Sequence, residues 1–283
     1  MTRILGTVTI GQSPRLDLIP EMKQVMAAGA TGASWDGASG ASCGSATGES
    51  CRDAAGEPGH PGQVVEVLEA GALDGLTLEE VRKLAPVQGD YVLVTRMADG
   101  TAVKIAERHI LPLMQEKIDG LVRRGADVVA LVCTGEFPQF HCDRLLVVPQ
   151  KVLFHAAAAV VGGQPVSQRT DVRQGSPTGG GVAQVGSTSF RLGVMLPDVD
   201  QVAQGIRRWS AVTPDVLVEP ASPYGRPEEI DQAARRLKEW GAGLVVMDCI
   251  GYTLAMKEKV RRIAGAPVIL ARSILARTLA ELA

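Results

Sequence analysis

Aromatic residues are scarce in this sequence, and asparagine is absent. Phe, Trp and Tyr together make up 4% of the 283 residues, although hydrophobic residues of all kinds make up 46%. The core must therefore be built from aliphatic side chains, chiefly Val, Leu, Ile and Ala. The length allows one large domain or two modest lobes.

The sequence also lacks long apolar runs and an excess of one charge. The formal net charge is -2 with scattered Lys and Arg, which excludes an electrostatic footprint for nucleic acid or an anionic membrane. No run approaches the roughly 20 apolar residues of a membrane span, and the stretch from Ile4 to Ile10 is too short for a secretory signal. We expect a cytoplasmic protein that binds a small molecule, with no nucleic-acid or membrane partner. Twofold assemblies are common, so a homo-oligomer stays open.

The five cysteines show no framework spacing, and their number is odd. A disulfide scaffold is therefore not expected, whereas free thiols in a reducing compartment are. Cys43 and Cys51 do not form a zinc pattern, because a structural zinc site needs about four ligands at closer spacing. We expect no metal and no other cofactor, and the role of these two cysteines stays open.

Strand and helix patterns alternate along the chain, which favours parallel sheets covered by helices. Two Gly-rich tracts, about 29–63 and 162–189, have no periodicity and are predicted to be flexible insertions. The predicted elements are strand 4–10, helix 16–27, a capped helix from Thr77, a hairpin formed by YVLVTR and TAVKI, helix 107–124, strand DVVALVC, strand RLGVML, helix 201–209, strand DVLVEP, helix 228–240 and strand GLVVMDC.

Residues 124–135 and 240–251 repeat one pattern, in which Gly125 matches Gly241 and Cys133 matches Cys249. Beyond each cysteine we predict a helical stretch, a further apolar strand and a closing helix. Two related halves follow, with a first lobe at 1–150, a second lobe at 151–271 and a C-terminal helix 272–283 that packs on the first lobe.

Each of the matched cysteines follows a predicted strand, where ligands bind in parallel α/β sheets. A helix start beyond each cysteine is expected to lower the thiol pKa from about 8.5. With the two sulfurs facing each other, one removes a proton from a carbon and the other supplies one to the opposite face. Backbone N–H groups around Thr134, Gly135, Ile250 and Gly251 are the expected donors to the developing enolate.

The alternative is that these cysteines only pack, since cysteine is among the most often buried residues. A single cysteine at a strand end favours that interpretation. Two at equivalent positions of a repeat favour function instead.

The motifs TIGQSPRLD, LTLEEVRKLAP, VLVTRMADG, VVMDCIGY and ILARTLAELA resemble the AroM family, within the aspartate/glutamate racemase superfamily. The resemblance implies an Asp/Glu racemase-like α/β fold with two pseudo-symmetric lobes, each a mostly parallel sheet flanked by helices. It also implies catalytic cysteines at Cys133 and Cys249. Racemases of that superfamily need both cysteines, whereas decarboxylases keep one and maleate isomerases attack the substrate covalently with one. Superfamily racemases often carry Asn-Thr after the first cysteine, whereas Thr134 and Gly135 follow Cys133, so the substrate need not be an amino acid.

Further candidates come from the loops at the same ends of the strands. Gln12, Ser13 and Arg15 follow the first strand and are expected at the rim, where Arg15 can hold a substrate carboxylate. In the alternative, Ser13 merely caps a helix that begins at Pro14.

Tyr224 lies in the loop EPASPYGRPEE, and Tyr252 comes three residues after Cys249. Both are candidates for contact with substrate, and a plain turn or a first helical turn is the alternative for each.

The leading hypothesis is a cofactor-independent racemase, epimerase or isomerase of a small carboxylate-bearing compound, with Cys133 and Cys249 as an acid/base pair. One alternative is a decarboxylase or thiolate-addition isomerase that needs a single cysteine. The other is a non-catalytic small-molecule-binding protein of the same fold.

Overall fold

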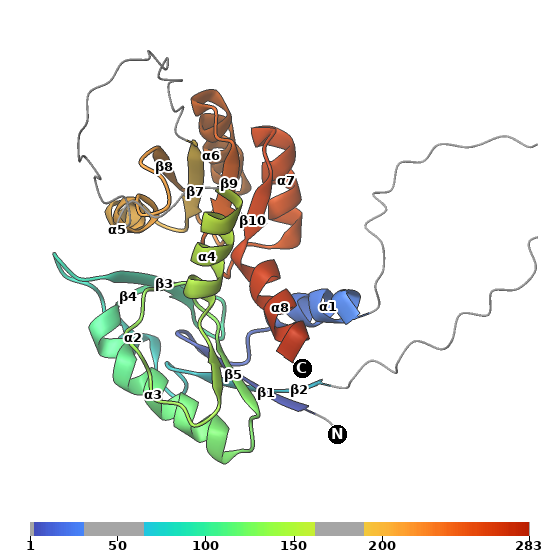
Figure 1. Cartoon of the computed structure of the whole chain (residues 1–283). Coiled ribbons are helices and arrows are strands. Elements are labelled where there is room, and N and C mark those ends of the chain that lie inside the picture. The colour runs from blue at the N-terminus through green and yellow to red at the C-terminus, as the bar shows by residue number, and fades with distance from the viewer. Residues whose placement is uncertain (1–2, 31–64, 162–189, 283) are drawn as a thin grey trace, which may run out of the picture.

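The computed structural model describes residues 3–30, 65–161 and 190–282. Two four-stranded sheets, each made of parallel strands, lie one above the other (Figure 1). Most of the two Gly-rich tracts predicted to be flexible, together with Cys43 and Cys51, lies outside the described residues. No helix within these ranges is both long and apolar enough to span a membrane.

The first sheet has the strand order β2-β1-β5-β6, and its strands are all parallel. A separate antiparallel hairpin, β3-β4, comes between β2 and β5 in the chain. The elements of this half are β1 (Arg3–Thr9), α1 (Ile19–Ala30), β2 (Val65–Gly71), α2 (Leu78–Arg82), β3 (Val92–Arg96), β4 (Ala102–Ala106), α3 (Glu107–Arg123), β5 (Val128–Leu131), β6 (Leu145–Val147) and α4 (Pro149–Val161).

The second sheet has the order β10-β9-β7-β8, and its strands are again parallel. When the four strands of each sheet are counted along the chain, the first lies between the second and the third, and the fourth lies beside the third. The two sheets share this order, so the predicted pseudo-symmetric two-lobed α/β fold is confirmed. The elements are β7 (Leu192–Leu196), a 3-10 helix η2 (Val199–Gln201), α5 (Val202–Trp209), β8 (Val216–Pro220), α6 (Pro227–Trp240), β9 (Leu244–Met247), α7 (Leu254–Ala264), β10 (Val268–Leu270) and α8 (Ala271–Leu282).

The closing helices cross between the two lobes. Helix α8 follows the second sheet but packs against α1 of the first, and Figure 1 shows the two side by side. Helix α4 follows the first sheet and contacts β10, and its Phe154 ring lies 5.7 Å from the ring of Trp209. Buried aliphatic residues of both lobes therefore share one core cluster, which fixes the lobes relative to each other.

Glycines end the helices that lead to the two cysteine-bearing strands. Gly125 has a φ of 91° and Gly241 a φ of 82°, a left-handed conformation that most residues adopt only with strain. The turn after α3 therefore starts β5, and the turn after α6 starts β9. The predicted capping box is also present, because Thr77 accepts from the N–H of Glu80 while the Glu80 carboxylate accepts from Thr77.

The prediction of a helix beyond Cys133 is wrong, because the chain from Cys133 to β6 is irregular. Phe140 is buried and packs against Phe137, with ring centroids 5.9 Å apart, and Pro138 between them has no N–H to donate. The side chain of Gln115 also accepts from the N–H of His141 at 3.0 Å and donates to its carbonyl at 2.9 Å. Burial of the aromatic rings thus replaces helical hydrogen bonding.

The helix predicted from Leu16 begins later, at Ile19. The carbonyl of Arg15 accepts from the N–H groups of Leu18 and Ile19, and Leu16 itself is 77% exposed. Ser13 and Pro14 are therefore too far upstream to cap this helix.

Candidate functional site

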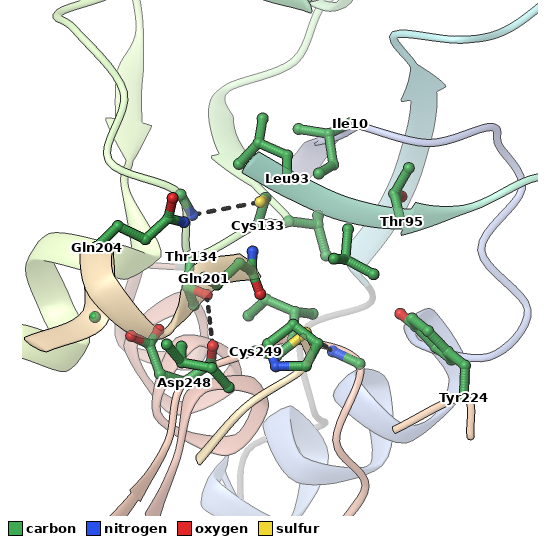
Figure 2. Close-up of a pocket in the computed structure, with 18 of the residues that line it drawn as sticks. Ile10, Leu93, Thr95, Cys133, Thr134, Gln201, Gln204, Tyr224, Asp248 and Cys249 are labelled. Carbon is green, nitrogen blue, oxygen red and sulfur yellow. Dashed lines mark hydrogen bonds between the residues drawn. The ribbon is translucent and has the colours of Figure 1, made fainter. Parts of the chain in front are cut away.

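One pocket contains both matched cysteines. Cys133 lies beyond the end of β5 and Cys249 beyond the end of β9, and both line the same space between the lobes (Figure 2). Its volume is about 40 Å³, whereas a single water needs roughly 10–15 Å³. The two strand ends therefore meet at a small internal site.

Each sulfur accepts a hydrogen bond from the glycine two residues further on. The N–H of Gly135 lies 3.4 Å from Cys133 Sγ, and the N–H of Gly251 lies 3.3 Å from Cys249 Sγ. These two N–H groups, predicted as donors to an enolate, point at the thiols and favour their thiolate form.

The prediction of a lowered thiol pKa is wrong. Burial raises the pKa of Cys133 to about 12 and that of Cys249 to about 11, which outweighs the hydrogen bonds from Gly135 and Gly251. Both side chains keep some exposure to the pocket, but protein atoms surround them closely enough for lost hydration to dominate. A helix dipole gives little help, since no helix follows Cys133 and α7 begins only at Leu254.

A charge on Cys249 further raises the pKa of Cys133, after the larger effect of burial. The loss of one proton therefore makes the loss of the second harder, as for two interacting titratable groups. A state with one thiolate and one thiol is thus favoured over a state with two thiolates.

The raised pKa values predict slow alkylation of both pocket thiols at pH 7, because only the thiolate attacks iodoacetamide. Labelling should rise about tenfold per pH unit as the thiolate fraction grows, and Cys249 should react before Cys133. Peptide mass spectrometry across pH 6–11 measures both rates, with Cys142, which does not line the pocket, as an internal reference. Half-maximal labelling of either pocket thiol near pH 7 contradicts the expectation.

Arg15 is buried and lines the pocket. Its Nε and Nη2 both donate to the Asp17 carboxylate at 2.8 Å, its Nη1 donates to Thr9 Oγ1 at 2.9 Å, and its Nη2 also reaches Tyr224 OH at 3.2 Å. The two-pronged contact predicted for a substrate carboxylate is therefore made to Asp17. This contact holds the guanidinium rigidly at the pocket wall.

Tyr224 also lines the pocket, beneath the guanidinium of Arg96, whose Cζ lies 4.8 Å from the ring centroid. Burial raises the pKa of its hydroxyl, which stays a neutral donor or acceptor. The Tyr224 hydroxyl lies close to the backbone of Gly251, where a glycine is needed because a Cβ would lie 2.5 Å from Tyr224 OH.

Thr134 and Ile250 line the pocket from opposite lobes. The hydroxyl of Thr134 donates to the Asp248 carbonyl at 3.2 Å, drawn as a dashed line in Figure 2, and so joins the lobes beside the cysteines. The carbonyl of Ile250 accepts from Arg272 Nε at 2.9 Å.

Three predicted residues lie outside the pocket. Gln12 donates to the carbonyls of Leu73 and Leu76, and Ser13 bonds to the Asp74 carboxylate. Tyr252 is fully buried in the core of the second lobe, where its hydroxyl donates to the Ala221 carbonyl at 2.5 Å. These side chains support the loops around the site and do not face its space.

A buried ion pair at the pocket was not predicted from the sequence. Arg208 Nη1 lies 2.8 Å from Asp248 Oδ2, and the same carboxylate oxygen accepts from Trp209 Nε1 at 2.8 Å. Arg208 also donates to the carbonyl of Thr134 at 3.1 Å and to the hydroxyl of Tyr91. It therefore links α5 of the second lobe to the loop and hairpin of the first.

Gln201 and Gln204 add a second link between the lobes that was not predicted. Both side chains donate from Nε2 to the carbonyl of Val92 at 3.0 Å, and the N–H of Val92 donates to Gln204 Oε1 at 3.3 Å. Gln201, Gln204 and Arg208 recur at helical spacing, so one polar face around α5 was a signal available in the sequence. All three line the pocket.

The chain is similar to one protein family and to several solved structures. A family model described as AroM protein matches residues 60–168 and 180–283. An aspartate racemase homologue from Pyrococcus horikoshii OT3 is 10% identical, with a TM-score of 0.42 and coverage of 100% of this chain and 99% of that chain. A proposed Asp/Glu racemase from Yersinia pestis is 10% identical, with a TM-score of 0.48 and coverage of 99% of each chain. No curated protein matches the chain. Both scores lie below 0.5, so family membership rests on the family model.

Proposed function

Because the chain belongs to the AroM family, and because two thiols from equivalent strand ends share one pocket, we propose that it is a cofactor-independent racemase, epimerase or isomerase. The substrate is a small carboxylate-bearing compound, and Cys133 and Cys249 are its acid/base pair. The observation that carries the proposal is the shared pocket, since thiols that only packed in the core would not need to meet there.

The proposed step is a proton transfer across a single carbon. One thiolate takes the proton from the carbon next to the carboxylate, and the electron pair passes into the carboxylate as an enolate. The other thiol then gives its proton to the opposite face of that carbon, which inverts the configuration and exchanges the roles of the two sulfurs. The lobes present the sulfurs from separate strand ends, as such a transfer requires.

The electrostatics of the pair suit this step. The like-charge effect of Cys249 on Cys133 favours one thiolate beside one thiol. The hydrogen bonds from Gly135 and Gly251 give the thiolate the same support on either side. Burial makes the thiolate a stronger base towards carbon once it has formed, while the same raised pKa keeps the fraction of thiolate low at neutral pH.

We assign the substrate carboxylate to the wall of the pocket that Arg15 forms. The contact of Arg15 with Asp17 fixes the plane of the guanidinium, and the positive charge of Arg15 stabilises the enolate that forms nearby. The small size of the pocket favours a small acid as the substrate.

The direct test is proton exchange in deuterium oxide with single enantiomers of small chiral carboxylic acids. At low conversion the product enantiomer should carry one solvent deuterium at the inverted carbon, while the recovered starting enantiomer stays unlabelled, because different sulfurs remove and deliver the proton. NMR and chiral chromatography measure both quantities. Carbon dioxide release in place of inversion would indicate a decarboxylase, and ligand binding without exchange would indicate a binding protein.

A further inference from the structure

Buried polar atoms without a hydrogen-bond partner gather at the pocket. Among the described residues, the side-chain atoms of this kind on pocket residues are Thr95 Oγ1, Gln201 Oε1, Arg208 Nε and Asp248 Oδ1. Thr95 and Asp248 are 1% exposed, and Gln201 is 7% exposed. A buried polar atom without a partner is costly, so such a cluster calls for a ligand that satisfies it.

Gln201 presents an acceptor, and its orientation is fixed by chemistry. Its Nε2 donates to the carbonyl of Val92 at 3.0 Å, and a carbonyl accepts but cannot donate. Rotating the amide by half a turn would set two oxygens against each other. The amide oxygen must therefore face away from Val92, and Figure 2 shows this side chain projecting into the pocket.

Asp248 presents a second acceptor. Its Oδ2 is held by Arg208 Nη1 and by Trp209 Nε1, each at 2.8 Å, while its Oδ1 has no partner. An ionised carboxylate has only acceptor sites, so Oδ1 requires a donor. Arg208 Nε is a different case, because it lies 3.3 Å from the carboxylate of Glu136, which balances its charge.

We infer that the ligand of this pocket carries an N–H or O–H group, in addition to its carboxylate, that donates to Gln201 Oε1. The carboxylate part of this inference rests on the proposed function. The donor part rests on the fixed, unpaired acceptor of Gln201. The substrate class is accordingly a small 2-hydroxy or 2-amino acid, and an unsubstituted carboxylic acid leaves this acceptor unpaired.

The test compares acids of equal length that differ in one substituent. Lactate, alanine and propionate form one set, and malate, aspartate and succinate form a longer one, with both enantiomers of each chiral acid. We expect the better hydroxy or amino acid of at least one set to bind the full-length protein at least about tenfold more tightly than the unsubstituted acid, measured by calorimetry or ligand-observed NMR. The tighter of the hydroxy and amino acids identifies the donor.

A pair of glutamine variants supplies the matched control. Gln201→Met removes the unpaired acceptor and should lower the preference for the donor-bearing acid to within about threefold of unity. Gln204→Met also removes a hydrogen bond to the Val92 carbonyl. In the unchanged protein Gln204 Oε1 is already paired with the Val92 N–H, so the preference for the donor-bearing acid should persist in this variant. A preference unchanged by Gln201→Met overturns the assignment of this residue.

The inference as a whole is overturned if the unsubstituted acid binds as tightly as its partners in both sets, or if no donor-bearing acid binds. This outcome is distinct from failure of the proposed function. A clear preference in binding without any deuterium exchange leaves the inference standing and removes the racemase. Exchange of an unsubstituted acid at the full rate does the reverse.

Discussion

Cys133→Ser and Cys249→Ser should each lower the rate of inversion by about 10²- to 10⁴-fold, the usual contribution of one general acid or base. A serine hydroxyl is too weak a base at neutral pH to replace a thiolate. Each single variant keeps one pocket sulfur, which in the proposed mechanism still serves one side of the substrate carbon. We therefore expect each variant to retain deuterium exchange with one enantiomer only, and the two variants to retain it with opposite enantiomers.

The third described cysteine provides the matched control for these substitutions. Cys142 is half-buried, packs against the first-lobe core and does not line the pocket, so Cys142→Ser should change the rate by less than about threefold. Chiral chromatography and NMR of the recovered acid give the inversion and exchange rates. Loss of activity in only one pocket variant indicates single-cysteine chemistry and contradicts the acid/base pair.

Much of the fold could be predicted because its signals are local. The apolar strands, the helix that ends before Gly241 and the capping box at Thr77 depend on neighbours in sequence. The repeat around the two cysteines also predicted that they follow equivalent strands, one in each half, at the strand ends where ligands bind in parallel α/β sheets. The structure places Cys133 and Cys249 in one pocket accordingly.

The chain beyond Cys133 shows where local patterns fail. Its apolar residues were consistent with a helix, but Phe137 and Phe140 are held by the first-lobe core, whose other members lie far away in sequence. The thiol pKa values were misjudged for a related reason. Loss of hydration depends on all the protein atoms that surround a sulfur, and spacing along the chain contains no measure of it.

The polar residues of the site were missed because their partners lie far away in the sequence. Asp248 directly precedes Cys249, yet its importance comes from Arg208, 40 positions away, and from the hydrogen bond of Arg208 to Thr134 across the pocket. Nothing near Asp248 in the sequence indicates a buried cation. The helical spacing of Gln201, Gln204 and Arg208 was the only local sign of this network.

The second large effect is expected on stability, for Arg208→Met. Arg208 pairs with Asp248 at 2.8 Å in a buried setting, and methionine removes the charge while it keeps much of the side-chain volume. Asp248 then keeps only Trp209 as a donor. Removal of one partner from a buried ion pair costs about 3–5 kcal/mol, so the free energy of unfolding in urea should fall by that order.

The double variant Arg208→Met/Asp248→Leu separates the unpaired charge from the lost packing. Without the carboxylate no uncompensated charge is buried, so the double variant should be more stable than Arg208→Met alone. Recovery should be incomplete, because Trp209 Nε1 then loses its acceptor. Arg261→Met tests the same substitution at an exposed position of α7, where the arginine pairs with Glu258, and should leave the unfolding midpoint nearly unchanged. Equal losses in Arg208→Met and the double variant would show that Arg208 stabilises the protein through its contacts to Thr134 and Tyr91, and that its charge pairing contributes little.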